Sequence, residues 1–155
     1  MKNKLKYLMT VLSIIGGHLL ACDCKPEKTV KDEIKWADIV IHGKIIKVTL
    51  DTILNKSADL DDTRPINEYK VLVNKKYKGK ISADTITIRT AAYDEACGLI
   101  LKVGESLIFY AKKDTKKSNV IDKKGKYIYY TSNCTRTRLF NQVEQSEIEK
   151  EIGNR

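Results

Sequence analysis

The residues of this chain that are most able to do chemistry lie close together, in the run Cys22-Asp23-Cys24-Lys25-Pro26. The run holds two of the four cysteines, and it follows a segment that has the composition of an export signal. Cleavage after Ala21 would make Cys22 the first residue of the mature protein, with an α-amine beside a thiol. We therefore expect the function to reside at this end of the mature chain.

Residues 1–21 predict a signal peptide. They begin with a cluster of lysines, continue in a largely apolar stretch and end on the small residue Ala21. The apolar stretch is shorter than the roughly 20 residues that a membrane-spanning helix needs. An uncleaved N-terminal anchor is the alternative. Cleavage would leave residues 22–155, a length that suits a single domain.

Two chemistries compete for the sulfur and the amine of Cys22. The run Leu19-Leu20-Ala21-Cys22 resembles the signal of bacterial lipoproteins, in which the sulfur receives a diacylglyceryl group and the amine is usually acylated. Ordinary cleavage would leave both groups unmodified. The sequence leaves both possibilities open, and we expect attachment to a membrane only if Cys22 is lipidated.

The chain carries 29 Lys and Arg against 20 Asp and Glu, for a formal net charge of +9. Removal of residues 1–21 takes away three lysines and no acidic residue, so 26 basic and 20 acidic side chains remain. The Lys-rich stretches 112–117 and 123–126 are expected to be solvated loops, because charges of both signs are interspersed elsewhere. We expect no nucleic-acid partner, since an exported protein seldom meets a nucleic acid.

Four cysteines in an exported chain of this size indicate two disulfides, with three possible pairings. A zinc site is the alternative, but His42 is the only histidine after residue 21 and no C-x-x-C pair occurs. His42 also lacks a nucleophile or carboxylate at a recognisable catalytic spacing, so we expect it to pack or hydrogen-bond within a strand. We therefore expect neither a cofactor nor an enzymatic activity.

Two short helices are predicted at the ends of the mature domain. Residues 29–37 have the periodicity of an amphipathic helix, with Glu33 on its polar side. Residues 143–152 have the same periodicity, and Gly153 is expected to cap the C-terminus. The residues expected to pack are Val30, Ile34 and Ala37 in the first helix and Val143, Ile148 and Ile152 in the second.

Five strands are predicted between these helices. The first, residues 38–50, is β-branched, and its alternation slips by one residue near 43–46, which predicts a β-bulge. The polar stretch 51–65 predicts a long, mobile loop. The other strands are predicted over residues 69–77, 85–90, 106–111 and 127–134.

The order of these elements favours an all-β fold with flanking helices. Five bent antiparallel strands without α/β alternation suggest a small closed barrel of the oligonucleotide/oligosaccharide-binding (OB) type, because closure removes exposed strand edges. A β-sandwich is the alternative from pattern alone.

Two groups of side chains near the end of the barrel have both a binding and a structural interpretation. Tyr127, Tyr129 and Tyr130 could stack on sugars or bases, but strand tyrosines more often pack. Arg136 and Arg138 could bind an acidic partner, and we favour pairing with acidic side chains on the protein surface.

Short motifs along the whole mature chain point to a known family. They are Cys22-x-Cys24-x-Pro26, Ala37-Asp38-Ile39-Val40-Ile41, Tyr77-Lys78-Gly79, Ala96-Cys97-Gly98 followed by Val103-Gly104, and Asn133-Cys134. In this order and spacing they resemble the netrin-like domain, and specifically the N-terminal domain of the tissue inhibitors of metalloproteinases. The run Cys134-Thr135-Arg136-Thr137-Arg138 is more similar to bacterial relatives than to the animal inhibitors.

The resemblance implies a five-stranded barrel and a specific pairing of the cysteines. Cys22 would pair with Cys97, and Cys24 with Cys134. Each bridge would close a long loop, a stabilisation of up to about 4–5 kcal/mol in the chain-entropy model. The animal domains have a third bridge that this chain lacks, since Lys35 lies near its first position and no cysteine follows Cys134.

The resemblance also implies an inhibitory mechanism. The α-amine and carbonyl of Cys22 would chelate the catalytic zinc of a partner metalloprotease, and Asp23 would enter its specificity pocket. The contact ridge would comprise these residues with Cys24, Lys25, Pro26, Ala96, Cys97, Gly98 and Leu99. The chain departs from the family at Asp23, where the family has Ser or Thr, and burial of a carboxylate costs free energy unless it is paired.

Two functions from different classes follow. The first is an exported, monomeric inhibitor of metalloendopeptidases that acts through Cys22. The second is a non-inhibitory cell-envelope protein or lipoprotein that binds a protein or a glycan. Either one is expected outside the cytoplasm, whether secreted, periplasmic or in the cell envelope, and lipidation of Cys22 would favour the second.

Overall fold

The computed structural model describes residues 24, 28–57, 60–92, 97–114 and 128–154. The predicted signal peptide, residues 1–21, lies outside the described residues, as does the Lys-rich stretch 123–126.

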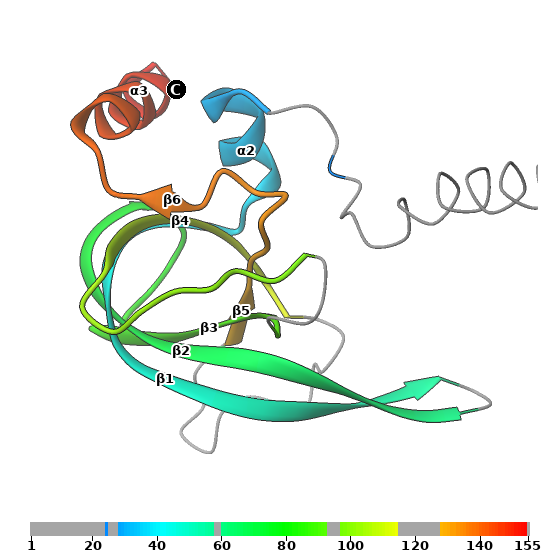
Figure 1. Cartoon of the computed structure of the whole chain (residues 1–155). Coiled ribbons are helices and arrows are strands. Elements are labelled where there is room, and N and C mark those ends of the chain that lie inside the picture. The colour runs from blue at the N-terminus through cyan, green and yellow to red at the C-terminus, as the bar shows by residue number, and fades with distance from the viewer. Residues whose placement is uncertain (1–23, 25–27, 58–59, 93–96, 115–127, 155) are drawn as a thin grey trace, which may run out of the picture.

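Five strands close into the barrel that the sequence predicts (Figure 1). They are β1 (Ile39–Ser57), β2 (Leu60–Lys78), β3 (Thr85–Ala91), β4 (Ser106–Lys113) and β5 (Ile128–Tyr130). The strands pair in the order β1-β2-β3-β5-β4, and β4 pairs again with β1 to complete the barrel. A two-residue strand, β6 (Arg138–Leu139), is added beside β4. The prediction of an OB-type barrel is therefore confirmed.

Strand β1 bends enough to pair with both β2 and β4, because its register against β2 shifts at three places. The shifts lie between Val40 and Ile41, between His42 and Gly43, and around Ile46. At Gly43 a Cβ atom would lie only 2.4 Å from Cγ1 of Val71, so the close approach of the two strands requires glycine. The predicted β-bulge is confirmed.

The barrel encloses an apolar core. Alternate residues of the paired strands β1 and β4 point inward, so Ile39 and Ile41 lie beside Leu107 and Phe109 in one cluster. The buried members of this interior cluster are Ile39, Ile41, Ile45, Tyr69, Val71, Ile86, Ile88, Leu107, Phe109, Ala111 and Tyr129.

A second apolar cluster lies outside the barrel, under the helices α2 (Val30–Trp36) and α3 (Gln142–Gly153) (Figure 1). The outward residues of β1 and β4 contribute to it, which explains why these strands are apolar at nearly every position. Its buried members are Val30, Ile34, Ala37, Val40, Ile108, Tyr110 and Ile148. We call this the helix-side cluster.

Both predicted helices are present, with corrections in detail. The N-cap Thr29 accepts a hydrogen bond from the amide of Asp32 at 3.1 Å, and the N-cap Asn141 accepts one from Glu144. Glu33 is fully buried, contrary to its predicted place on the polar side. Val143, predicted to pack, is 71% exposed, and the C-cap is Asn154 rather than Gly153.

The prediction of a long loop over residues 51–65 is wrong. Strands β1 and β2 stay paired from Val40 with Lys78 to Ser57 with Leu60, and form a long two-stranded ribbon (Figure 1). The polar composition misled the prediction, because the backbone hydrogen bonds of a ribbon do not require apolar side chains.

The predicted fifth strand is only partly correct. Strand β5 ends at Tyr130 rather than at Cys134, and it pairs in parallel with β3, so the strands are not all antiparallel. Tyr129 is buried in the core and Tyr130 is 38% exposed, while Tyr127 lies outside the described residues. Tyr129 thus packs, as favoured.

His42 has the structural role that was predicted. Its Nε2 lies 2.7 Å from Oγ of Ser106, and its ring stacks on Phe140 with centroids 4.1 Å apart. Burial lowers the pKa of His42, and the positive charge of Lys75 lowers it further.

Candidate functional site

The chain after β5 makes a tight turn over residues 131–137, and threonine hydroxyls hold it. Oγ1 of Thr131 lies 2.9 Å from Oγ1 of Thr135 and 2.8 Å from Oγ1 of Thr137. The Thr131 hydroxyl also donates to the carbonyl of Tyr110 in β4 at 3.0 Å. Hydroxyls both donate and accept, so short side chains can satisfy one another here. The turn is therefore a firm support for the cysteine and the arginine that it carries.

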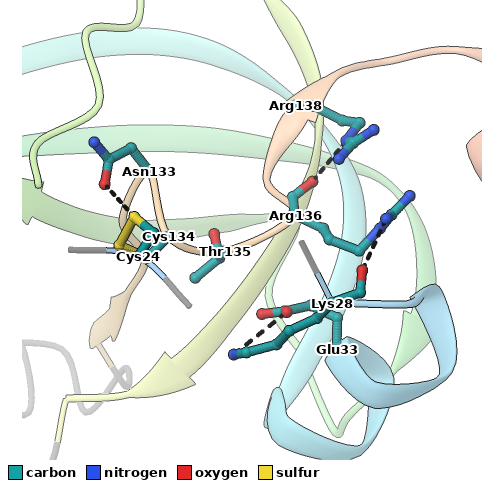
Figure 2. A pocket seen from close by; sticks show the side chains of 8 residues that line it. All are labelled: Cys24, Lys28, Glu33, Asn133, Cys134, Thr135, Arg136 and Arg138. Carbon is teal, nitrogen blue, oxygen red and sulfur yellow. Dashed lines mark hydrogen bonds and ion pairs between the residues drawn. A yellow bond between two sulfur atoms is a disulfide. The ribbon is translucent and has the colours of Figure 1, made fainter. Parts of the chain in front are cut away.

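The turn is joined covalently to the start of the described chain. A disulfide links Cys24 to Cys134 with the Cα atoms 5.1 Å apart (Figure 2). The backbone amide of Asn133 donates to the backbone carbonyl of Cys97 at 3.2 Å, which brings the loop of Cys97 against the turn. Cys97 is disulfide-bonded as well. Its predicted partner, Cys22, lies outside the described residues, so that pairing stays a prediction.

The loop that carries Cys97 is fixed to the barrel on its other side. The Tyr69 hydroxyl donates to the carbonyl of Leu99 at 2.8 Å, and the amide of Leu99 donates to Oγ1 of Thr90 at 3.0 Å. At Gly98 a Cβ atom would lie 2.5 Å from the carbonyl oxygen of Ala91, so only glycine fits. These contacts give the predicted ridge residues Gly98 and Leu99 a defined backbone.

Arg136 joins the turn to helix α3. Its Nε donates to Oε1 of Glu144 at 3.0 Å, and its Nη2 donates to Oε2 at 2.6 Å. The Tyr110 hydroxyl donates to the same carboxylate at 2.6 Å, and Nη1 of Arg138 lies 3.7 Å from it. Bidentate, charge-assisted contacts of this kind are among the strongest polar interactions in proteins.

The same guanidinium reaches the segment that follows Cys24. Nη1 of Arg136 donates to the carbonyl of Lys28 at 2.9 Å. The Lys28 side chain lies 3.5 Å from Oε2 of Glu33, and its Nζ lies 4.8 Å from the centre of the Trp36 ring. The backbone and the side chain of Lys28 therefore have separate anchors.

A pocket of about 280 Å³ lies between helix α2 and the turn (Figure 2). Glu33 is fully buried beside it, and neither of its carboxylate oxygens accepts a hydrogen bond from the residues that the structure describes. The residues that line the pocket are Cys24, Lys28, Glu33, Asn133, Cys134, Thr135, Arg136 and Arg138.

The two buried carboxylates of this region have opposite electrostatic behaviour. Burial raises the pKa of Glu33, and the nearby charge of Lys28 offsets this only in part. Burial also acts to raise the pKa of Glu144, but hydrogen bonds from Arg136 and Tyr110 outweigh it and hold the pKa below its usual value. The ionised form of Glu144 is thus favoured on balance, whereas burial disfavours that of Glu33 despite its ion pair with Lys28.

The structure describes four of the nine predicted ridge residues, namely Cys24, Cys97, Gly98 and Leu99. The other five, Cys22, Asp23, Lys25, Pro26 and Ala96, lie outside the described residues. The turn brings the described cysteines of the predicted ridge to one place, since it binds Cys24 through Cys134 and touches the Cys97 loop through Asn133.

Three residues of this site were not predicted from the sequence: Lys28, Glu33 and Glu144. Arg136 was predicted to pair at the surface, but its side chain is only 13% exposed and that of Glu144 only 4%. Charged residues in amphipathic helices normally face water, so no local signal marked the two glutamates. The motif Cys134-Thr135-Arg136 was the one available indication, because it places an arginine next to a bridged cysteine.

Among the described residues, no helix is long and apolar enough to span a membrane, and no group of three or more His, Cys, Asp or Glu could hold a metal ion.

Comparison with known proteins identifies the family. The family model for tissue inhibitor of metalloproteinase matches residues 20–146, a range that includes all four cysteines and every strand of the barrel. A search of curated proteins found no match. Proteins of the matched family are inhibitors rather than enzymes. The match covers well over half of the chain and agrees with the barrel and its disulfide, so the chain belongs to the tissue inhibitor of metalloproteinase family.

Proposed function

We propose that this protein is an exported inhibitor of zinc metalloendopeptidases and that it acts through the mature N-terminus at Cys22. The single observation that carries the proposal is the bond between Cys24 and Cys134, which fastens the chain to the barrel two residues after Cys22. The α-amine and the carbonyl of Cys22 are the groups proposed to bind the partner's zinc. Family membership supports this assignment.

The chemistry suits a catalytic zinc ion. Such an ion keeps one coordination position open for water or substrate, and an amine together with a carbonyl oxygen can occupy it. The pKa of an α-amine is near 8, so a substantial fraction is neutral and able to coordinate at physiological pH. A segment that is already fixed loses little conformational entropy on binding, which favours affinity.

Asp23 would determine which enzymes respond. A carboxylate that enters an apolar specificity pocket loses its hydration, so we expect a preference for a protease whose pocket offers a cation or hydrogen-bond donors. The proposed location is outside the cytoplasm, whether secreted, periplasmic or in the cell envelope, in keeping with a disulfide-bonded chain.

The proposal predicts that the protein exported by its natural host begins at an unmodified Cys22. Its intact mass should rise by about 4 mass units on full reduction, as two disulfides require. This preparation should inhibit at least one member of a panel of zinc endopeptidases. Acetylation near neutral pH is selective for the α-amine, because lysine amines stay largely protonated there. It should abolish inhibition, because an acetylated amine cannot bind zinc.

A matched control tests whether inhibition needs the α-amine at the position of Cys22 or only a free α-amine. A variant with one alanine added before Cys22 keeps a free α-amine but moves it away from the bridged cysteine, and we expect it not to inhibit. Inhibition that survives acetylation would rule out zinc binding by the amine. A mass that includes a diacylglyceryl group, together with a panel that does not respond, would instead favour an envelope protein that binds a protein or glycan without inhibiting.

A further inference from the structure

Two residues near the start of the described chain, Cys24 and Lys28, are each fastened to the turn. The first contact is the disulfide between Cys24 and Cys134, and the second is the hydrogen bond of 2.9 Å from Arg136 to the carbonyl of Lys28. Cys24 and Lys28 are four residues apart in the sequence, and the residues that hold them, Cys134 and Arg136, are two apart. Figure 2 shows both anchors on the same turn.

A disulfide alone does not orient the chain that follows it. A disulfide holds two Cα atoms at a nearly fixed distance but allows the chain on either side to rotate about its single bonds. A second contact at Lys28, four residues later, restricts that rotation. The carbonyl of Lys28 is well suited for this role, because its residue directly precedes the N-cap Thr29 of helix α2.

Arg136 is itself held in a single orientation. Two of its nitrogens bind Glu144, and Glu144 is fixed by Tyr110 and by its place in the first turn of helix α3. The third nitrogen then points at the Lys28 carbonyl. Only a planar guanidinium can make all three contacts together, since a lysine ammonium is a single point of charge.

We propose that Arg136 is a positioning residue, which sets the direction in which the first residues of the mature chain leave the barrel and thereby sets their affinity for the partner's zinc site. This inference rests on the proposed function. Arg136 itself would not touch the zinc. It acts through Lys28, and it lowers the entropy that the N-terminal segment loses on binding.

The variant Arg136→Lys tests the inference with little risk to folding, because a lysine can still pair with the buried Glu144. It should lose the contact with the Lys28 carbonyl. We expect the inhibition constant against a responding metalloprotease to rise by roughly tenfold, the size associated with one charge-assisted hydrogen bond.

The matched control is Ile148→Val. Ile148 is fully buried in helix α3 within the helix-side cluster, so this variant weakens the packing of α3 without altering the polar contacts of Arg136. We expect its inhibition constant to stay within about twofold of the native value. An equal rise in both variants would mean that Arg136 only attaches α3, and the inference would be wrong.

A second measurement does not depend on inhibition. Backbone ¹⁵N order parameters of Cys24 and Lys28 should be near 0.85 in the native protein and in Ile148→Val, and should fall below about 0.6 in Arg136→Lys. Unchanged order parameters in Arg136→Lys would overturn the inference whether or not any protease responds. If the native protein inhibits nothing while the order parameters fall as expected, the proposed function fails and the positioning role of Arg136 stands.

Discussion

The two sides of strand β4 face very different surroundings. Phe109 points into the barrel, where the buried neighbours of the interior cluster are hydrophobic. Tyr110, the next residue, points outward to the helix-side cluster, where its hydroxyl meets the carboxylate of Glu144 and, through it, Arg136. One strand therefore takes part in two kinds of stabilisation.

This difference distinguishes the contacts that stabilise the fold from the contacts that orient one segment of it. Apolar burial is roughly proportional to area and has little directional preference, so the barrel interior can stabilise the fold without orienting any one group. Hydrogen bonds and ion pairs depend on angle and distance, so the contacts of Arg136 and Glu144 can hold a segment in one direction. The polar contacts occur where the N-terminal segment joins the barrel (Figure 2).

The largest effect is expected in the barrel interior. Phe109→Ala should lower the free energy of unfolding by about 4 kcal/mol, because it removes a fully buried aromatic ring and leaves a cavity. Denaturant titration would measure it. Val143→Ala is the control, since Val143 is 71% exposed and its loss should have little effect. Similar losses in both variants would contradict the assignment of the interior as the main source of stability.

The next effect concerns the buried carboxylate on the helix side. Glu144→Gln should lower the free energy of unfolding at pH 7 by about 2 kcal/mol, because it removes the charged partner of Arg136 in a site where both side chains are largely buried. Glu149→Gln is a matched control on the same helix. Glu149 pairs with Lys75 at 2.7 Å, but both side chains are well exposed and the loss should be much smaller.

The same variant has a defined pH dependence. The pKa of Glu144 is lowered in the folded protein, so its stabilising contribution is complete above the usual carboxyl pKa and is lost as the pH falls through the folded value. Native protein and Glu144→Gln should therefore converge in stability under acidic conditions. A difference that stays constant down to pH 2 would show that the charge of Glu144 is not responsible.

The smallest effect should have the opposite sign. The buried carboxylate of Glu33 accepts no hydrogen bond from the described residues, and Lys28, 3.5 Å from it, only partly offsets its burial. Burial raises the pKa of Glu33, so the ionised form costs stability above the folded pKa. Glu33→Gln should raise the free energy of unfolding at neutral pH by about 1 kcal/mol. The gain in stability should vanish at pH 3, where Glu33 of the native protein is protonated and therefore as neutral as the glutamine of the variant. A loss of stability at neutral pH would mean that the contact with Lys28 outweighs the burial of the charge.

Local patterns predicted the elements of the barrel well where burial was strong. The apolar run of residues 106–111 and the slip in alternation near Gly43 both correspond to observed features of β4 and β1. Patterns failed where backbone pairing continued without an apolar signal, as in the ribbon over residues 51–65. They failed also at β5, which ends early because the chain turns at Thr131.

The candidate site was predictable in its covalent part only. The bridge from Cys24 to Cys134 followed from the family resemblance, and the turn that carries it is now visible. The buried positions of Glu33 and Glu144 were not predictable, because each lies in a helix whose other charged residues are mostly exposed. Their burial depends on partners that are far away in the sequence.

The sequence by itself determined that this chain is a disulfide-bonded, mostly β domain with a helix at each end, since cysteines and apolar periodicity are local properties, and the family motifs favoured a barrel over a sandwich. Only the tertiary structure decided that Arg136 would bind Glu144 and also donate to the carbonyl of Lys28, which lies 108 residues from Arg136 in the sequence. A single hydrogen bond of this kind leaves no periodic mark on the chain. It exists because barrel closure brings the turn, α2 and α3 together at the start of the mature domain.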